Sequence, residues 1–129
     1  MAFRHLLTSL NHVSVSPARL SLLTRVSNMH FLVIANDHTD AEALDRRLAA
    51  RMKHLEGAKE LHSKSTNSLH LGGAILDDQG KMVGSTLIYE AESIEKVKEI
   101  IANDPYTLNN VWDPNNIIIK QIKLADLKQ

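Results

Sequence analysis

The chain has 129 residues, enough for one domain with a single hydrophobic core, and 43% of them are hydrophobic, as is usual for soluble globular proteins. It contains no cysteine, which excludes a disulfide framework, thiol catalysis and thiolate metal sites. The formal net charge is zero, aromatic residues make up 4%, and no apolar run approaches the ~20 residues that span a bilayer. Neither nucleic acid nor a membrane is therefore an expected partner.

The first 28 residues differ in composition from the rest of the chain. They contain three arginines and no acidic residue, and Phe3, Leu6, Leu7 and Leu10 fall on one face of a short helix. This pattern is typical of a mitochondrial transit peptide and predicts a location in the matrix. Two alternatives are a disordered extension and initiation at Met29, which would leave the protein in the cytoplasm. In each case we expect the folded domain over residues 29–129.

A strand and a long helix are predicted at the start of this domain. The apolar run from His30 to Asp37 is rich in β-forming residues and ends in turn residues, so it predicts a buried strand. Thr39 and Glu42 have the spacing of a capping box, which predicts that the helix begins there and runs to about Ser63. The apolar spacing predicts a buried stripe made of Leu44, Leu48, Leu55 and Ala58.

A hairpin and a second helix are predicted next. Strands over residues 68–78 and 81–92 flank the turn residues Asp78-Gln79-Gly80. Ser93 is a good N-cap for a helix whose apolar face is formed by Ile94, Val97 and Ile101. That helix ends near Asn103, because the residue before Pro105 is disfavoured in helical conformation. A loop over 104–116 then leads to a fourth strand over 117–126.

The predicted order is β-α-β-β-α-β. This order is typical of the ferredoxin-like fold, an α+β architecture in which both helices cover one face of a four-stranded antiparallel sheet. The first and fourth strands are apolar at nearly every position, so the other face is also expected to be covered. No residues remain to cover it. We therefore expect a homodimer that packs sheet to sheet as an α+β barrel.

Several short motifs occur in a characteristic order along residues 29 to about 125. They are Asp37 after the first strand, the R-x-x-H-L of Arg51, His54 and Leu55, the pair Gly72-Gly73, the segment Gly84-Ser85-Thr86, and the segment Asp104-Pro105-Tyr106. In this order and spacing the chain resembles the YCII-related (YciI-like) domain. It departs from the usual pattern at Met52, where the family usually has proline, and at Asn110, where the family often has glycine.

The resemblance implies a fold, an assembly and a kind of site. The implied fold is ferredoxin-like and dimerises as an α+β barrel, with no metal or organic cofactor as a general requirement. The family is regarded as enzymatic, with a histidine and an aspartate acting in a pocket. Relatives in the dimeric barrel superfamily include lactone isomerases and cofactor-free oxygenases.

His54 and Asp104 are the predicted catalytic pair. Histidine titrates near neutrality, so His54 can act as a general base or acid, and Asp104 could fix its tautomer and stabilise the imidazolium. A helical wheel places Arg51 inside the apolar stripe. A buried arginine needs a partner, and Asp37 and Asp104 are the expected ones. Arg51 could also hold an anionic substrate group, or extend its stem to water.

The remaining candidates are residues that could contact a substrate. Ser85 could hydrogen-bond to it, and Tyr106 and Trp112 could wall a pocket or simply cap the core. A Ser/His/Asp nucleophile triad is disfavoured because no G-x-S-x-G turn accompanies it. No H-x-x-x-H or H-E-x-x-H spacing occurs, and His54 and His62 are about 12 Å apart along a helix, so no metal site is expected. His62 and His70 are interpreted as structural.

Together these observations predict a cofactor-free enzyme that uses His54 and Asp104 for proton transfer on a small organic molecule, in an isomerisation or an elimination. The expected substrate-binding residues are Asp37, Arg51, Ser85, Tyr106 and Trp112. The alternative is a non-catalytic module that binds a small molecule or serves in dimeric assembly.

Overall fold

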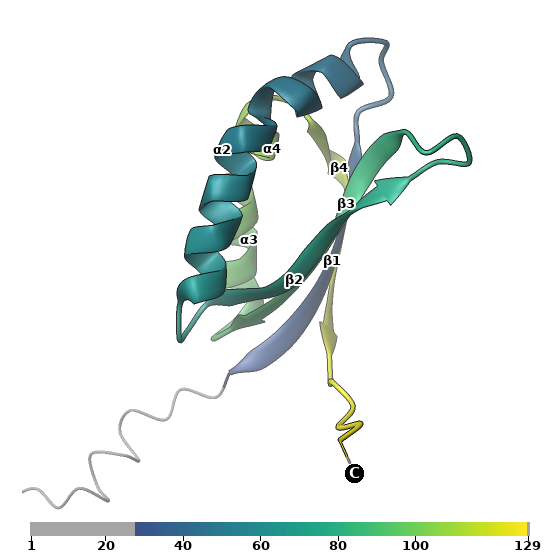
Figure 1. The fold of residues 1–129 in the computed structure, drawn as a ribbon. Helices are drawn as coiled ribbons and strands as arrows, with labels where there is room; N and C mark the ends of the chain where they lie inside the picture. Colours follow the sequence, from purple (N-terminus) through teal and green to yellow (C-terminus); the bar gives the residue numbers. More distant parts are fainter. Residues whose placement is uncertain (1–27, 129) are drawn as a thin grey trace, which may run out of the picture.

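The computed structural model describes residues 28–128, which form a four-stranded sheet with helices packed on one face (Figure 1). The elements are β1 (Met29–Asp37), α2 (Ala43–Ser63), β2 (Ser68–Leu76), β3 (Met82–Ala91), α3 (Ile94–Ala102), α4 (Pro105–Leu108) and β4 (Trp112–Ile122). Apart from Asn28, the segment for which targeting is predicted lies outside the described residues. In the described part, no helix is both long enough and apolar enough to cross a membrane.

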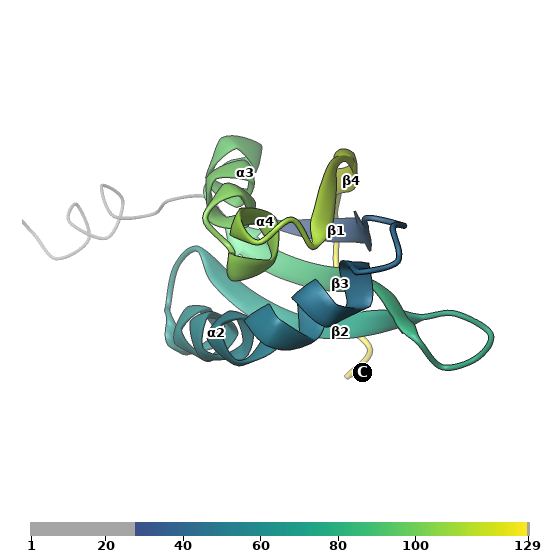
Figure 2. The same ribbon diagram turned by 90° about the horizontal axis from the view of Figure 1, so that it is seen from above.

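The sheet has the strand order β2-β3-β1-β4, and every neighbouring pair is antiparallel. Helix α2 connects β1 to β2, and α3 with α4 connects β3 to β4, so each crossover joins two strands that are not neighbours in the sheet, and both crossovers lie on the same face. Figure 2 shows α2, α3 and α4 on one side of the sheet, seen from above. The predicted βαββαβ order and the ferredoxin-like α+β class are confirmed.

The central position of β1 in the sheet explains why its sequence is apolar at almost every position. Phe31, Val33 and Ala35 are buried under the helices, and they alternate with Leu32 and Ile34 on the opposite face, which are half-buried. Both faces of this central strand therefore carry apolar side chains. No helix or strand of the described residues covers the second face.

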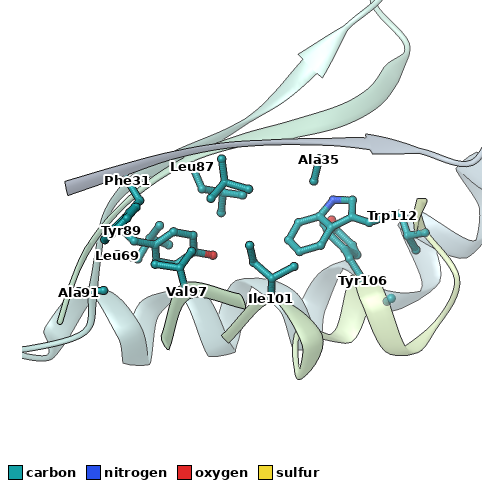
Figure 3. Close-up of a cluster of buried hydrophobic side chains, with 13 residues drawn as sticks. Phe31, Ala35, Leu69, Leu87, Tyr89, Ala91, Val97, Ile101, Tyr106 and Trp112 are labelled. Atoms are coloured by element: carbon teal, nitrogen blue, oxygen red, sulfur yellow. The ribbon is translucent and has the colours of Figure 1, made fainter. Parts of the chain in front are cut away.

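The hydrophobic core fills the layer between the sheet and the helices (Figure 3). Tyr89 and Phe31 from the sheet meet Val97 and Ile101 from α3, and all four are almost completely buried. Ser93 accepts a hydrogen bond from the Lys96 amide at 3.1 Å and caps α3, as predicted. The predicted apolar face of this helix is confirmed by the burial of Val97 and Ile101.

The predicted hairpin between β2 and β3 is also confirmed. The Asp77 amide donates to the carbonyl of Lys81 at 2.9 Å, and the Asp77 side chain accepts from the amides of Gln79 and Lys81. Gly80 closes the turn with a φ of +80°, which glycine adopts without steric cost.

The predicted capping box at the start of α2 is wrong. The helix begins at Ala43 with Glu42 as its N-cap, and no side chain caps it. Asp40 organises the turn instead, because its carboxylate accepts two hydrogen bonds of 2.7 Å from Arg46. These hydrogen bonds lower the pKa of Asp40 to about 2. Arg46 also donates to the carbonyl of Asn110 at 3.0 Å, so the pair fixes the turn to the loop before β4.

The buried stripe of α2 also differs from the prediction. Its buried residues are Ala43, Arg47, Ala50 and His54, whereas Leu48 is 51% exposed and Leu55 is 36% exposed. Leu44 and Ala58 are half-buried. The prediction places the leucines on the buried face. In the structure the small side chains of Ala43 and Ala50 allow the helix to approach the sheet, and Arg47 and His54 form hydrogen bonds beneath it. The helix is therefore rotated by about one residue relative to the predicted orientation.

The segment after α3 is more regular than the predicted loop. Asp104 caps the short helix α4 by accepting a hydrogen bond from the Tyr106 amide at 2.8 Å, with Pro105 at the first helical position. Strand β4 begins at Trp112, five positions before the predicted start, and its register shifts between Ala35 and Asp37 of β1. Pro114 is tolerated inside this strand because β4 is an edge strand.

The close approach of β1 and β3 at Gly84 yields a stability prediction. A Cβ at Gly84 would lie 2.9 Å from the carbonyl oxygen of Ala35, so Gly84→Ala must push the two strands apart. We expect it to lower the free energy of unfolding by about 1–3 kcal/mol in urea denaturation. Gly73→Ala is the matched control, since nothing lies within 4 Å of its added Cβ. Equal losses in the two variants would contradict the prediction.

Candidate functional site

A cavity of about 630 Å³ lies between α2 and the β2–β3 half of the sheet. It exists because β2 supplies almost no side chain to fill the space under the helix. Gly72 pairs with Leu87, and Ala74 pairs with Ser85, and these two small residues occupy the positions of β2 that face the helix beyond Leu69. The sequence predicted a pocket, but not that glycine and alanine would open it.

His54 and Asp104 meet at the inner end of this cavity. His54 Nδ1 lies 2.8 Å and 3.0 Å from the two carboxylate oxygens of Asp104, and both side chains are about nine-tenths buried. A carboxylate can only accept, so Nδ1 carries the proton and donates. The Nε2 atom makes no hydrogen bond within residues 28–128, and the His54 ring borders the cavity. The arrangement leaves Nε2 available to a ligand.

Aromatic rings fix the orientation of the imidazole. Tyr106 stacks on His54 with 3.9 Å between ring centroids and 14° between planes, and Trp112 meets the same ring edge-on at 5.7 Å. Burial raises the pKa of the Tyr106 phenol, so it stays neutral and can donate a hydrogen bond. Asp104 therefore holds the His54 ring at Nδ1, Tyr106 covers one face of it, and Trp112 packs against it edge-on.

A buried ion pair lies beside the histidine pair. Arg47 Nη1 donates to both carboxylate oxygens of Asp37, at 2.8 Å and 3.0 Å, and Nη2 donates to Ser85 Oγ at 2.9 Å. Both charged side chains are at most 4% exposed. Burial raises the pKa of the Asp37 carboxyl, and the Arg47 guanidinium opposes this rise. The Arg47 guanidinium also lies 4.6 Å from the centroid of the Tyr106 ring.

Ser85 is held as an acceptor. Its oxygen receives hydrogen bonds from Arg47 at 2.9 Å and from the Trp112 indole at 3.1 Å, which use both of its lone pairs. Its own hydroxyl proton has no acceptor among the described residues, and Ser85 borders the cavity. No hydrogen bond joins Ser85 to His54 in this part of the chain, so the geometry does not favour a serine nucleophile.

The buried ion pair expected for Arg51 does not form, whereas the alternative of a side chain that extends to water is consistent with its position. Arg51 is exposed at the rim of the cavity and forms no ion pair within the described residues, because Arg47 takes Asp37 and His54 takes Asp104. Arg51 and Lys59 border the cavity together with Arg47, whose charge Asp37 balances, and no acidic residue of the described chain borders it. The lining is therefore electropositive.

The structure brings the candidate residues together in two layers. His54, Arg51, Ser85 and Tyr106 border the cavity. Asp104, Asp37 and Trp112 lie behind them, each bonded to a residue that does border it. Arg47 is the residue that the sequence reasoning missed. A usable signal was its spacing, because Arg47 and His54 are seven positions apart, close to two helical turns, and so share a face.

Loss of the buried arginine should be costly. In Arg47→Met, Asp37 stays buried without a counter-charge, so we expect the free energy of unfolding to fall by roughly 3–5 kcal/mol in chemical denaturation. Arg46→Met is the matched control: its ion pair with Asp40 is accessible to solvent and screened, so its loss should lower the free energy of unfolding far less. The double variant Arg47→Met/Asp37→Asn should recover part of the loss. Similar losses for Arg46→Met and Arg47→Met would refute this account.

Comparisons with known proteins agree with this fold. An uncharacterized protein of Haemophilus influenzae is 28% identical over 99 residues, which cover 74% of this chain and 97% of that protein. The solved structure of 5-chloro-2-hydroxyhydroquinone dehydrochlorinase from Burkholderia phenoliruptrix AC1100, in complex with 2,5-dihydroxybenzoquinone, is 29% identical, with a TM-score of 0.62 over 75% of this chain and 96% of that one. The family profile of the YCII-related domain matches residues 29–120, and the chain belongs to this family.

Proposed function

We propose that the protein is an enzyme that uses His54 to remove a proton from a small hydroxylated organic molecule, in an elimination or an isomerisation. The observation that carries this proposal is the His54–Asp104 pair, in which Nδ1 is bonded to the carboxylate and Nε2 is left without a partner at the cavity. A proton transfer consumes no electrons, so the proposed step invokes no cofactor.

In this proposal His54 Nε2 is the general base. Donation from Nδ1 to Asp104 keeps the lone pair on Nε2, and the carboxylate stabilises the imidazolium that forms when the proton arrives. Asp104 itself is fixed by the Tyr106 amide, at 2.8 Å from Oδ1. The same Tyr106 stacks on the imidazole, so the acceptor and the ring are positioned by one residue.

The cavity supports a substrate that becomes more negative during the reaction. Arg51 and Lys59 supply positive charge that no acid in the lining offsets, whereas Asp37 balances the charge of Arg47. The Ser85 hydroxyl and the neutral Tyr106 phenol can donate hydrogen bonds to a developing oxyanion. Asp37 and Trp112 act as positioning residues in this scheme, because they hold Arg47 and Ser85 rather than bordering the cavity.

The dehydrochlorinase suggests the substrate with which to begin. Dehydrochlorination removes one proton and one chloride ion from the substrate, and the chloride leaves with the bonding electrons, so the step balances without an external oxidant. A general base facing a small positively charged cavity suits this chemistry. We therefore choose 5-chloro-2-hydroxyhydroquinone as the first substrate and 2,5-dihydroxybenzoquinone as the first ligand, both named for that related structure.

Replacement of Asp104 by asparagine should separate chemistry from binding. In Asp104→Asn the amide can still cap α4 but can donate to Nδ1, which places the imidazole proton on Nε2. We expect chloride release to fall by roughly 10²–10⁴-fold while 2,5-dihydroxybenzoquinone binds within a few-fold of wild type. Nitrogen NMR of the imidazole should show the tautomer exchanged.

Asp78→Asn is the control for this change, since Asp78 lies in the β2–β3 turn and forms no side-chain hydrogen bond in the described chain. It should leave turnover and tautomer unchanged. Ligand binding without turnover in wild-type protein, for this substrate and for related hydroxylated lactones and ketones, would favour the alternative of a binding module. Equal turnover in Asp104→Asn and wild type would remove Asp104 from the mechanism.

We also propose that the open face of the sheet is covered by a second copy of the chain. Several cross-strand neighbours on this face are apolar: Leu71 lies beside Ile88, Ile88 beside Leu32, and Ile34 beside Ile118. Leu71 is 57% exposed and Ile118 is 47% exposed in the single chain. These residues form an apolar patch that no element of the described chain covers, and such a patch favours self-association, although Lys120 lies beside Leu32 and the His30–Glu90 pair lies on the same face.

A single charge on this face should weaken the dimer. Ile118→Lys would bury an unpaired ammonium, at a cost of about 3–5 kcal/mol, so the dimer dissociation constant should rise at least about a hundredfold in sedimentation velocity. Leu108→Lys is the control, because Leu108 is 67% exposed on α4, on the helical side. A wild-type protein that sediments as a monomer at high concentration would contradict the proposed assembly.

A further inference from the structure

Three metal-ligating side chains other than His54 and Asp104 converge on the sheet, and one of them, His70, also borders the cavity. His30 of β1 and Glu90 of β3 are direct cross-strand partners, and both point away from the core helices because their neighbours Phe31 and Tyr89 point into the core. His70 of β2 joins them at a register irregularity between Leu69 and Leu71. The extra residue at this bulge lets the His70 side chain reach Glu90.

The distances bring the three donor atoms into one small space. His70 Nε2 lies 2.7 Å from Glu90 Oε2, and His30 Nε2 lies 3.9 Å from the same oxygen. The two imidazole rings meet edge to face, with centroids 5.0 Å apart. One donor atom from each residue lies within 4.8 Å of the other two. The short contact explains His70 and Glu90 as a hydrogen-bonded pair, but 3.9 Å is too long for a hydrogen bond and leaves His30 unexplained.

We infer that His30, His70 and Glu90 form a binding site for a first-row divalent cation, with Zn²⁺ as the best match. Two imidazoles and one carboxylate make a three-ligand set that holds Zn²⁺ and leaves a further position open to water. Ligands at about 2.0–2.2 Å from a tetrahedral ion stand about 3.4 Å apart. The observed contacts of 2.7 Å and 3.9 Å bracket this separation, so small side-chain movements suffice.

Chemistry and access both favour this class of ion. Mg²⁺ and Ca²⁺ prefer all-oxygen sites, whereas imidazole selects zinc and its neighbours in the first row. The side chains of His30, His70 and Glu90 are 26%, 38% and 25% exposed in the single chain, so an ion can reach them before the proposed dimer covers this face. The three residues are forty and twenty positions apart in sequence and come from three strands. This separation explains why a search for local histidine spacing predicts no metal.

The test is calorimetric titration of the full chain, stripped with a chelator, with Zn²⁺ alone. We expect binding that His30→Gln, His70→Gln and Glu90→Gln each weaken at least about tenfold. His38→Gln is the control, since His38 is half-buried just after β1 and lies outside the cluster. Binding of equal strength in all variants, or no binding up to about 1 mM Zn²⁺, would overturn the inference.

A second set of measurements distinguishes loss of a zinc ligand from misfolding of a variant. In wild-type protein, NMR signals of the His30 and His70 rings should shift on addition of Zn²⁺, while those of His54 stay in place. Zinc should also raise the melting temperature of wild type and His38→Gln, but not of the three cluster variants. A zinc-induced shift of His54 alone would assign the ion to the cavity and refute the cluster. No substrate is needed, so the outcome is independent of the proposed enzymatic function.

Discussion

The buried pair of Arg47 and Asp37 is the constraint on which the rest of the site depends. A guanidinium under a helix is tolerable only with a fixed counter-charge, and the last residue of β1 supplies it. Arg47 also donates to Ser85 of β3, which in turn accepts from Trp112 of β4. One side chain of α2 therefore connects the helix to three strands, and its burial determines which face of α2 points inward.

The position of His54 follows from that choice. Two helical turns separate it from Arg47, so the helix rotation that buries the arginine also directs the imidazole toward Asp104. Elsewhere in the same layer the packing is mainly apolar, with Val97 and Ile101 near Tyr89 (Figure 3). The domain thus has a hydrophobic end that supplies stability and a polar end whose geometry is held by hydrogen bonds.

The sequence was a good guide where a local rule determines the structure. The alternation in β1, the Ser93 cap and the Gly80 turn each depend on neighbouring residues, and each was predictable. The buried face of α2 was not predictable from local rules. The leucine spacing indicated one face, but the helix buries another, because Arg47 and His54 on that face pair with Asp37 and Asp104, which are distant in sequence. The residues of α4 and the start of β4 were missed for a similar reason. Their structure depends on the Asp104 cap and on pairing with β1.

The candidate site was predictable as a set of residue types, not as a geometry. His54 and Asp104 were identified together from motifs, and the structure places them in contact. Arg51 was assigned a buried partner that Arg47 holds instead. The His30, His70 and Glu90 cluster could not be found from spacing, since it is assembled only when three strands pair and one of them bulges.

Trp112 gives this molecule an optical property. It is the only tryptophan in the chain, its indole N–H is bonded to Ser85, and its ring touches His54 at an edge. All the intrinsic indole fluorescence of the protein therefore comes from a side chain that contacts residues bordering the cavity. Changes in charge or occupancy at His54 and Ser85 act directly on that fluorophore, so the unmodified protein carries its own probe of the site.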